Sequence, residues 1–141
     1  YRRQRQMCIR DSCSAGHPPT MVIRPESMPL GGGEARGGEV ELLGCQSGVI
    51  GAFESMVYET GVFTFAPGDM LFIYTDGTIE ARDRTGAFFG EQRLRDLLLS
   101  VSGEGVSGIC GKVLGELDRF TESALDDDIA LVSLEFLRGR S

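Results

Sequence analysis

The sequence predicts an α+β fold in which antiparallel sheets form layers and helices lie on the outside. Short β-rich stretches dominate the first part of the chain, two segments with helical spacing follow, and one apolar stretch of strand length comes last. Because strands and helices do not alternate, the parallel sheet of a βαβ fold is not expected. Residues 70–75 (MLFIYT) give the sharpest strand signal, and their near-continuous apolar character predicts burial on both faces.

The first part of the chain is predicted to be strands separated by turns rich in glycine and proline. Residues 13–15 end a short strand, which Gly16-His17-Pro18-Pro19 closes. Further strands are predicted at residues 20–24, 39–43, 56–59 and 62–65. The last two form a hairpin around Thr60-Gly61, whereas residues 31–38 (GGGEARGG) and 46–52 are predicted to be irregular.

Two turns, two helices and a last strand complete the predicted order. In Ala66-Pro67-Gly68-Asp69 the proline presets φ and the glycine supplies the positive φ of a type II turn, and residues 83–86 form another turn. Residues 91–100 and 107–120 repeat leucine, isoleucine and valine at helical spacing, so each predicts an amphipathic helix. Residues 129–136 (IALVSLEF) predict a final buried strand.

Composition indicates a globular protein and argues against two classes of partner. Hydrophobic residues make up 41% of the chain and charged residues 25%, which is typical of a folded domain. A net charge of −7 argues against a nucleic-acid partner, because phosphate binding requires a basic surface. The apolar runs are too short to span a membrane, and no signal peptide is recognisable. We therefore expect no nucleic-acid partner and no membrane segment.

The cysteines indicate neither a disulfide framework nor a zinc site. The four are Cys8, Cys13, Cys45 and Cys110, and no Cys-x-x-Cys pair occurs among them. The single histidine, His17, cannot complete a zinc pattern. Reduced thiols are therefore expected, in agreement with a cytoplasmic protein.

Residues 1–12 differ in character from the rest of the chain. They begin with Tyr1, carry Arg2, Arg3, Arg5 and Arg10, and show no hydrophobic period. Two interpretations stay open. The segment is of doubtful origin, from a truncated reading frame, or it is a disordered basic arm.

Aspartates stand at the ends of two predicted strands. Asp76 follows the apolar run 70–75 and precedes Gly77, and the acidic run Asp126-Asp127-Asp128 precedes the last strand. If these strands lie side by side, the carboxylates share a small space, and a hard divalent cation is the usual reason to accept their repulsion. Each element taken alone also fits a structural turn. Together they predict a site for a divalent metal.

Several blocks of this sequence resemble the PPM/PP2C superfamily of protein phosphatases, in particular its bacterial SpoIIE/RsbU-like branch. The blocks occur in the family's order and cover most of the chain. They are Ala15-Gly16-His17-Pro18-Pro19, Pro67-Gly68-Asp69, Tyr74-Thr75-Asp76-Gly77, Glu80-Ala81-Arg82, Phe89-Gly90-Glu91 with Arg93-Leu94, and Asp127-Asp128-Ile129.

The resemblance implies an α-β-β-α sandwich of antiparallel sheets flanked by helices. It also implies two Mn²⁺ or Mg²⁺ ions in a cleft, where a water activated by both metals attacks the phosphorus of phosphoserine or phosphothreonine. Asp76 and Asp127 match the positions of two metal-ligating aspartates in the family. Asp128 and Gly77 are secondary candidates, either at the metal or behind its ligands. His17 is a candidate for the edge of the site or for a structural turn.

The chain departs from the family pattern at its start. The family places an aspartate that bridges both metals in an upstream Asp-x-x-Gly-His-Gly-like motif, and residues 1–14 contain only Asp11. Ala130 stands where the family commonly has threonine. We therefore expect residues 13–138 to be the C-terminal part of a PP2C-like domain, incomplete at its N-terminus, with residues 139–141 as a tail. Metal binding should be weak and turnover small or absent.

The implied substrate is a phosphorylated bacterial regulatory protein, such as an anti-sigma-factor antagonist in a signalling pathway, and such phosphatases often follow an N-terminal sensor domain. Two alternatives remain. Thr75-Asp76-Gly77-Thr78 is similar to the nucleophile motif of haloacid-dehalogenase-like phosphatases, but that motif requires an aspartate where Tyr74 stands. The chain could also be a non-catalytic PP2C-like interaction module, although the retained Asp76 and Asp127 argue against it.

Overall fold

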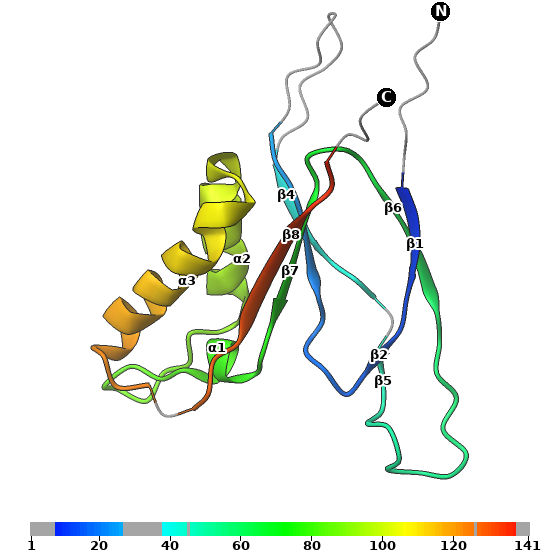
Figure 1. Cartoon of the computed structure of the whole chain (residues 1–141). Helices are drawn as coiled ribbons and strands as arrows, with labels where there is room; N and C mark the ends of the chain where they lie inside the picture. The colour runs from blue at the N-terminus through cyan, green and yellow to red at the C-terminus, as the bar shows by residue number, and fades with distance from the viewer. Residues whose placement is uncertain (1–7, 27–37, 45, 126, 138–141) are drawn as a thin grey trace, which may run out of the picture.

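The computed structural model describes residues 8–26, 38–44, 46–125 and 127–137. Within these ranges the chain has the predicted α+β architecture, with strands followed by helices and a last strand (Figure 1). Most of the predicted loop 31–38 and all of the tail 139–141 lie outside the described residues, as do Cys45 and Asp126.

A four-stranded antiparallel sheet forms the centre of the molecule, in the order β4-β3-β7-β8. Its strands are β3 (Met21–Arg24), β4 (Glu39–Leu42), β7 (Met70–Tyr74) and β8 (Leu131–Glu135). The predictions at 20–24, 39–43 and 70–75 are thus confirmed to within one residue at each end. In the described part of the chain β7 is an inner strand, so it has hydrogen-bonded neighbours on both sides.

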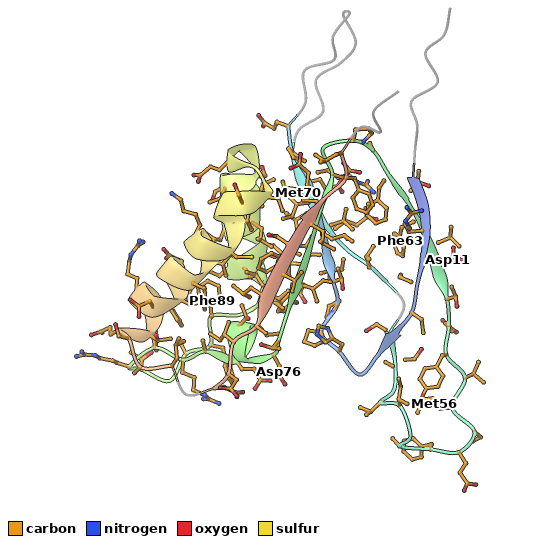
Figure 2. All side chains as sticks on the ribbon, in the orientation of Figure 1. Asp11, Met56, Phe63, Met70, Asp76 and Phe89 are labelled. Atoms are coloured by element: carbon orange, nitrogen blue, oxygen red, sulfur yellow. The ribbon has the colours of Figure 1, made fainter. Side chains whose placement is uncertain are left out.

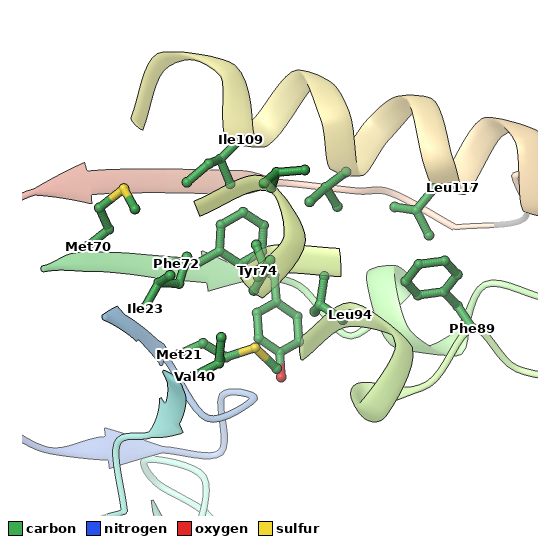
Figure 3. Close-up of a cluster of buried hydrophobic side chains, with 13 residues drawn as sticks. Met21, Ile23, Val40, Met70, Phe72, Tyr74, Phe89, Leu94, Ile109 and Leu117 are labelled. Atoms are coloured by element: carbon green, nitrogen blue, oxygen red, sulfur yellow. The ribbon is translucent and has the colours of Figure 1, made fainter. Parts of the chain in front are cut away.

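Two helices cover one face of this sheet, as Figure 1 shows. They are α2 (Glu91–Val101) and α3 (Val106–Thr121), joined by a short 3₁₀ turn at Ser102–Glu104. Figure 3 shows their apolar side chains packed against the strands, with Leu94, Ile109 and Leu117 facing Phe72 and Tyr74. The helical spacing in the sequence therefore predicted both helices and most of the apolar residues that they bury, whereas Leu114, at the predicted spacing, is exposed.

A second, smaller layer lies beside the opposite face of the sheet (Figure 1). In it β1 (Cys8–Ser12) pairs antiparallel with β6 (Gly61–Phe65), and β2 (Ser14–Ala15) pairs parallel with β5 (Gln46–Ser47). The layers meet in a small apolar cluster, in which the ring of Phe65 stacks on that of Phe136 at 4.1 Å between centroids. The described residues thus supply one helical layer and two sheet layers of the expected α-β-β-α sandwich.

The turn before β7 has the predicted geometry. Gly68 has φ +96°, and the amide of Asp69 donates to the carbonyl of Ala66 at 3.0 Å. The carboxylate of Asp69 accepts from the amide of Ala66 at 2.8 Å, which closes the turn a second time. This turn sets the start of β7 and therefore the register of the strand that ends at the candidate site.

The predicted hairpin of residues 56–59 and 62–65 is wrong. Residues 56–60 form no strand, and β6 pairs instead with β1, which lies about fifty residues earlier in the chain. The expectation of a disordered arm also fails for residues 8–12, because they form β1. Pairing between distant segments leaves no local pattern in the sequence, and this explains both errors.

Two predictions of burial need correction. Along β7 the buried residues Met70, Phe72 and Tyr74 alternate with half-buried ones, so only one face is fully covered. The last strand, predicted to be buried, lies at the edge of the main sheet, and Val132 and Leu134 are 48% and 50% exposed. The apolar composition of a strand does not reveal whether another strand or layer covers it.

Among the described helices none is both long and apolar enough for a membrane span.

Candidate metal site

Asp76 lies at the exposed end of the central strand. β7 ends at Tyr74, and the short helix α1 (Gly77–Glu80) begins at the residue directly after Asp76. Asp76 is the N-cap of this helix, and its Oδ1 accepts a hydrogen bond from the amide of Gly77 at 3.0 Å. Figure 2 shows Asp76 at this end of the sheet, below the two large helices. The sequence analysis missed α1, because four residues are too few to show helical periodicity.

The acidic segment Asp127-Asp128 lies directly before the neighbouring strand. Both residues are exposed, and the amide of Asp128 donates to Oδ1 of Asp127 at 2.8 Å. β7 and β8 are antiparallel neighbours, with Tyr74 opposite Leu131. The end of β7 and the start of β8 therefore meet at one edge of the sheet, as the interpretation of the two acidic sites required.

Gly77 shows how closely these two segments approach. A Cβ atom at position 77 would lie 2.8 Å from the backbone oxygen of Asp128 and 3.3 Å from Cβ of Asp127. No side chain fits at such a distance from a backbone atom without a shift of the chain. Glycine at this position thus permits the acidic segment to lie against the residue that follows Asp76.

Thr75 connects the two strand ends through three hydrogen bonds. Its amide donates to the carbonyl of Ala130 at 3.1 Å, and its Oγ1 accepts from the amide of Ala130 at 3.0 Å. The same hydroxyl donates to the carbonyl of Asp128 at 3.2 Å. The sequence analysis did not single out Thr75. Its position between the strand and Asp76 was the available signal, but its partners depend on the strand register.

A shallow hollow of about 220 Å³ opens beside Asp127. It is lined by Gly77, Glu80, Ala81, Arg82, Leu125 and Asp127. The guanidinium of Arg82 lies 4.1 Å from the ring centroid of Phe88 and donates to the carbonyl of Gly86 at 3.3 Å. The hollow therefore has carboxylates and one guanidinium in its lining.

The chemistry of the donors suits a hard cation, but the described residues do not form a full ligand set. Asp76 and Asp127 offer carboxylate oxygens, which Mg²⁺ and Mn²⁺ prefer. No group of three or more His, Cys, Asp or Glu side chains arranged for a metal exists within the ranges that the structure describes. The ligand atoms that the structure brings together are thus of the type that binds a divalent metal, but they are too few to complete its coordination.

His17 lies in the loop between β2 and β3. Its Nδ1 is 2.8 Å from the carbonyl oxygen of Pro18, and its own carbonyl accepts from the hydroxyl of Ser14 at 3.2 Å. Gly16 before it has φ +79°, and a Cβ there would lie 2.5 Å from Cγ2 of Val49. The hydrogen bonds of His17 are local to the loop and describe a tight turn, and within the described residues His17 does not join Asp76 and Asp127 in a metal cluster.

Tyr74, two residues before Asp76, is buried beneath the site. Its hydroxyl has no hydrogen-bond partner among the described residues. Burial, and secondly the negative charge of Glu91, raise the pKa of Tyr74 to about 12. The phenol therefore stays neutral at ordinary pH and acts as part of the core, not as an acid of the site.

Comparison with known proteins places these motifs in a family. The model of Stage II sporulation protein E (SpoIIE) matches residues 10–137. Protein IcfG of Synechocystis sp. is 28% identical over 124 residues, which cover 86% of this chain and 17% of IcfG. The chain thus spans about a sixth of the length of this curated relative.

Solved structures share the fold. The RsbU and RsbW domains of Rv1364c from Mycobacterium tuberculosis match with a TM-score of 0.63 and 26% identity, over 92% of this chain and 32% of that one. The SiaA-PP2C domain of Pseudomonas aeruginosa gives a TM-score of 0.64 at 20% identity, over 95% and 48%. The Mn-presoaked phosphatase domain of SpoIIE from Bacillus subtilis gives 0.58 at 15%, over 98% and 54%. The predicted PP2C-like fold is confirmed, and the chain spans only part of each of these neighbours.

Proposed function

The chain belongs to the SpoIIE family of PP2C-type phosphatases, as its motifs indicated, and we propose that it forms part of a metal-dependent protein serine/threonine phosphatase. The observation that carries the proposal is the approach of Asp127 and Asp128 to Gly77, directly beside Asp76. Two exposed carboxylates that the fold keeps at one sheet edge repel each other without a cation between them. A divalent cation bound between them would offset this repulsion.

We assign Asp76 and Asp127 as metal ligands, with Mn²⁺ or Mg²⁺ as the ion. When two such ions are bound, they supply an activated water for attack on a phosphate ester. Gly77 gives room for the acidic segment, and Asp128 contributes mainly through its backbone. The Mn-presoaked state of the Bacillus subtilis neighbour supports manganese as the ion to test first.

A backbone amide fixes one oxygen of each of the two aspartates. The amides of Gly77 and Asp128 each donate to one oxygen of the neighbouring carboxylate, at 3.0 and 2.8 Å. Fixing a side chain in advance lowers the entropy lost on binding. Each carboxylate has a second oxygen through which it can bind a metal.

We propose that further ligands come from outside residues 1–141, in the upstream part of the domain that holds the bridging aspartate in this family. The partial coverage of the solved neighbours supports this division. The chain alone should then bind metal weakly and turn over little substrate.

For the substrate we propose a serine-phosphorylated regulatory protein, such as an anti-sigma-factor antagonist, in the bacterial cytoplasm. The presence of RsbU and RsbW domains together in the Mycobacterium tuberculosis neighbour supports a role in regulatory signalling. An upstream sensor or regulatory domain would control the activity, and the Bacillus subtilis neighbour that includes a fragment of a regulatory domain supports this arrangement.

The test is phosphate release from a phosphoserine protein by the full-length protein that contains this chain, with and without Mn²⁺. We expect activity that requires Mn²⁺ and falls by orders of magnitude in the Asp76→Asn and Asp127→Asn variants, with unfolding temperatures close to that of the unmodified protein. Activity near that of the unmodified protein in either variant would show that the assigned residue is not a ligand.

A non-catalytic interaction module is the second candidate function. It differs from the first proposal in that no upstream residues would complete the ligand set. In that case the full-length protein would bind its phosphorylated partner and release no phosphate at any Mn²⁺ concentration. The same phosphate-release assay therefore separates the two functions.

A further inference from the structure

We infer that Thr75 is a positioning residue, whose hydroxyl holds the acidic segment 127–130 in place beside Asp76. This inference rests on the proposed function, because it concerns the proposed ligand Asp127. The hydroxyl of Thr75 accepts the hydrogen bond that a backbone carbonyl of β7 would otherwise accept from the neighbouring segment.

The argument begins with the register of β7 and β8. Tyr74 lies opposite Leu131, so Thr75 lies opposite Ala130. In an antiparallel pair of this kind the two residues exchange both of their backbone hydrogen bonds. The first bond is present, because the amide of Thr75 donates to the carbonyl of Ala130 at 3.1 Å.

The second backbone bond is replaced. The carbonyl of Thr75 accepts from the amide of Thr78 at 3.0 Å, since the chain turns into α1 after Asp76. The amide of Ala130 has thereby lost its usual acceptor. It donates instead to Oγ1 of Thr75 at 3.0 Å.

The same hydroxyl also donates a hydrogen bond to the acidic segment. Oγ1 of Thr75 donates to the carbonyl of Asp128 at 3.2 Å. One side chain thus binds the backbone on both sides of Ile129, at Asp128 and at Ala130. That carbonyl is also the atom only 2.8 Å from the Cβ position of Gly77, so the hydroxyl bonds the segment where it approaches most closely.

Only serine and threonine offer a donor and an acceptor on one short side chain at this point. Valine has the shape of threonine and lacks both functions. Partners behind metal ligands commonly change metal affinity by about 10- to 100-fold when they are lost. We therefore expect Thr75→Val to weaken Mn²⁺ binding to this extent, and Thr75→Ser to preserve it.

The experiment compares the unmodified chain with Thr75→Val, Thr75→Ser and the control Thr85→Val. The control removes a threonine hydroxyl that bonds Asp83 in the turn after α1. Two quantities are measured, the exchange rate of the Ala130 amide by NMR and the affinity for Mn²⁺ by titration. In Thr75→Val we expect exchange about tenfold faster or more and weaker Mn²⁺ binding, with neither change in the other two variants.

Equal Ala130 exchange in Thr75→Val and the unmodified chain would overturn the inference. Faster exchange with unchanged Mn²⁺ affinity would also overturn it, because the hydroxyl would then be purely structural. If Thr75→Val does not fold, the unmodified chain alone tests the hydrogen bond from the Ala130 amide to the Thr75 hydroxyl. Exchange of this amide as fast as in an unstructured peptide would contradict that bond. If the unmodified chain shows no Mn²⁺ binding, the assignment of Asp76 and Asp127 as metal ligands fails, whereas the exchange data still report on the hydroxyl.

Discussion

Gly77 sets the distance between the two proposed metal ligands. Alanine at this position would place its Cβ 2.8 Å from the backbone oxygen of Asp128, so one of the two segments must move. We predict that Gly77→Ala weakens Mn²⁺ binding by about tenfold or more, because fewer oriented carboxylate oxygens can then reach one ion.

The matched control is Gly115→Ala in α3, where a Cβ would meet nothing within 4 Å. This change should leave Mn²⁺ affinity unaltered and raise the free energy of unfolding by up to about 1 kcal/mol, because alanine favours the helix. Titration with Mn²⁺ and urea unfolding of both variants measure the two effects. Unchanged Mn²⁺ affinity in Gly77→Ala would mean that the close approach has no part in binding.

Tyr74 makes stability depend on pH in the alkaline range. Its pKa is about 12 in the folded chain, where burial disfavours the phenolate, against an ordinary value of 10.0. Above pH 10 the unfolded chain loses this proton while the folded chain keeps it, so the free energy of unfolding falls as pH rises toward 12. Below pH 10 both states are protonated and this contribution is fully present.

The Tyr74→Phe variant should lose this part of the pH dependence. Because the buried hydroxyl has no partner among the described residues, its removal should leave the free energy of unfolding at pH 7 unchanged or slightly higher. Urea unfolding at pH 7 and at pH 10 to 11 checks both statements. A loss of several kcal/mol at pH 7 would show that the hydroxyl has a partner after all.

The sequence predicted Asp76 and Asp127 as a pair, and the structure brings their segments together. The prediction depended on the two strands being neighbours, and the antiparallel pairing of β7 with β8 meets that condition. Thr75 could not be predicted in the same way. Its role depends on the loss of one backbone acceptor to α1, and the sequence analysis missed both α1 and the register that makes Ala130 its partner.

The helices show which elements a sequence specifies locally. Helix α3 buries Leu117 completely and leaves Leu114 44% exposed, although the predicted helical spacing of residues 107–120 included both. We predict that Leu117→Ala lowers the free energy of unfolding by about 2 to 5 kcal/mol, since it opens a cavity in the core. Leu114→Ala should change it by less than about 1 kcal/mol. Urea unfolding of both variants is the measurement, and equal losses would mean that the helix packs by another face.

The strands were harder to predict because their neighbours lie far away in the chain. The pairing of β1 with β6 joins residues about fifty positions apart, and no local signal marked residues 8–12 as a strand. The exposure of β8 likewise depends on its place at the edge of the sheet, and an apolar stretch does not encode that place. Local periodicity was therefore enough to predict the helices, whereas the pairing and burial of the strands depend on the topology of the sheets.

At the scale of the whole molecule, the two faces of the four-stranded sheet are covered unequally. Helices α2 and α3 cover one face, and the core lies between them and the strands (Figure 3). On the other face the small sheet packs against the main one through Phe65 and Phe136, and a groove of about 400 Å³ beside this contact has Phe63 and Leu71 in its lining. This uneven coverage agrees with our proposal that the chain is one part of a larger domain.

The most direct test of the account is a titration of the chain with Mn²⁺ in which electron paramagnetic resonance measures the free and bound ion. The variants are Asp76→Asn, Asp127→Asn and the control Asp96→Asn, which changes an exposed carboxylate on α2 that accepts a hydrogen bond from Gln92. We predict weak, saturable binding by the unmodified chain and the control, and affinity lower by about tenfold or more in each of the other two variants. Equal affinity in all four proteins, or no saturable binding by the unmodified chain, would contradict the assignment of Asp76 and Asp127 as metal ligands.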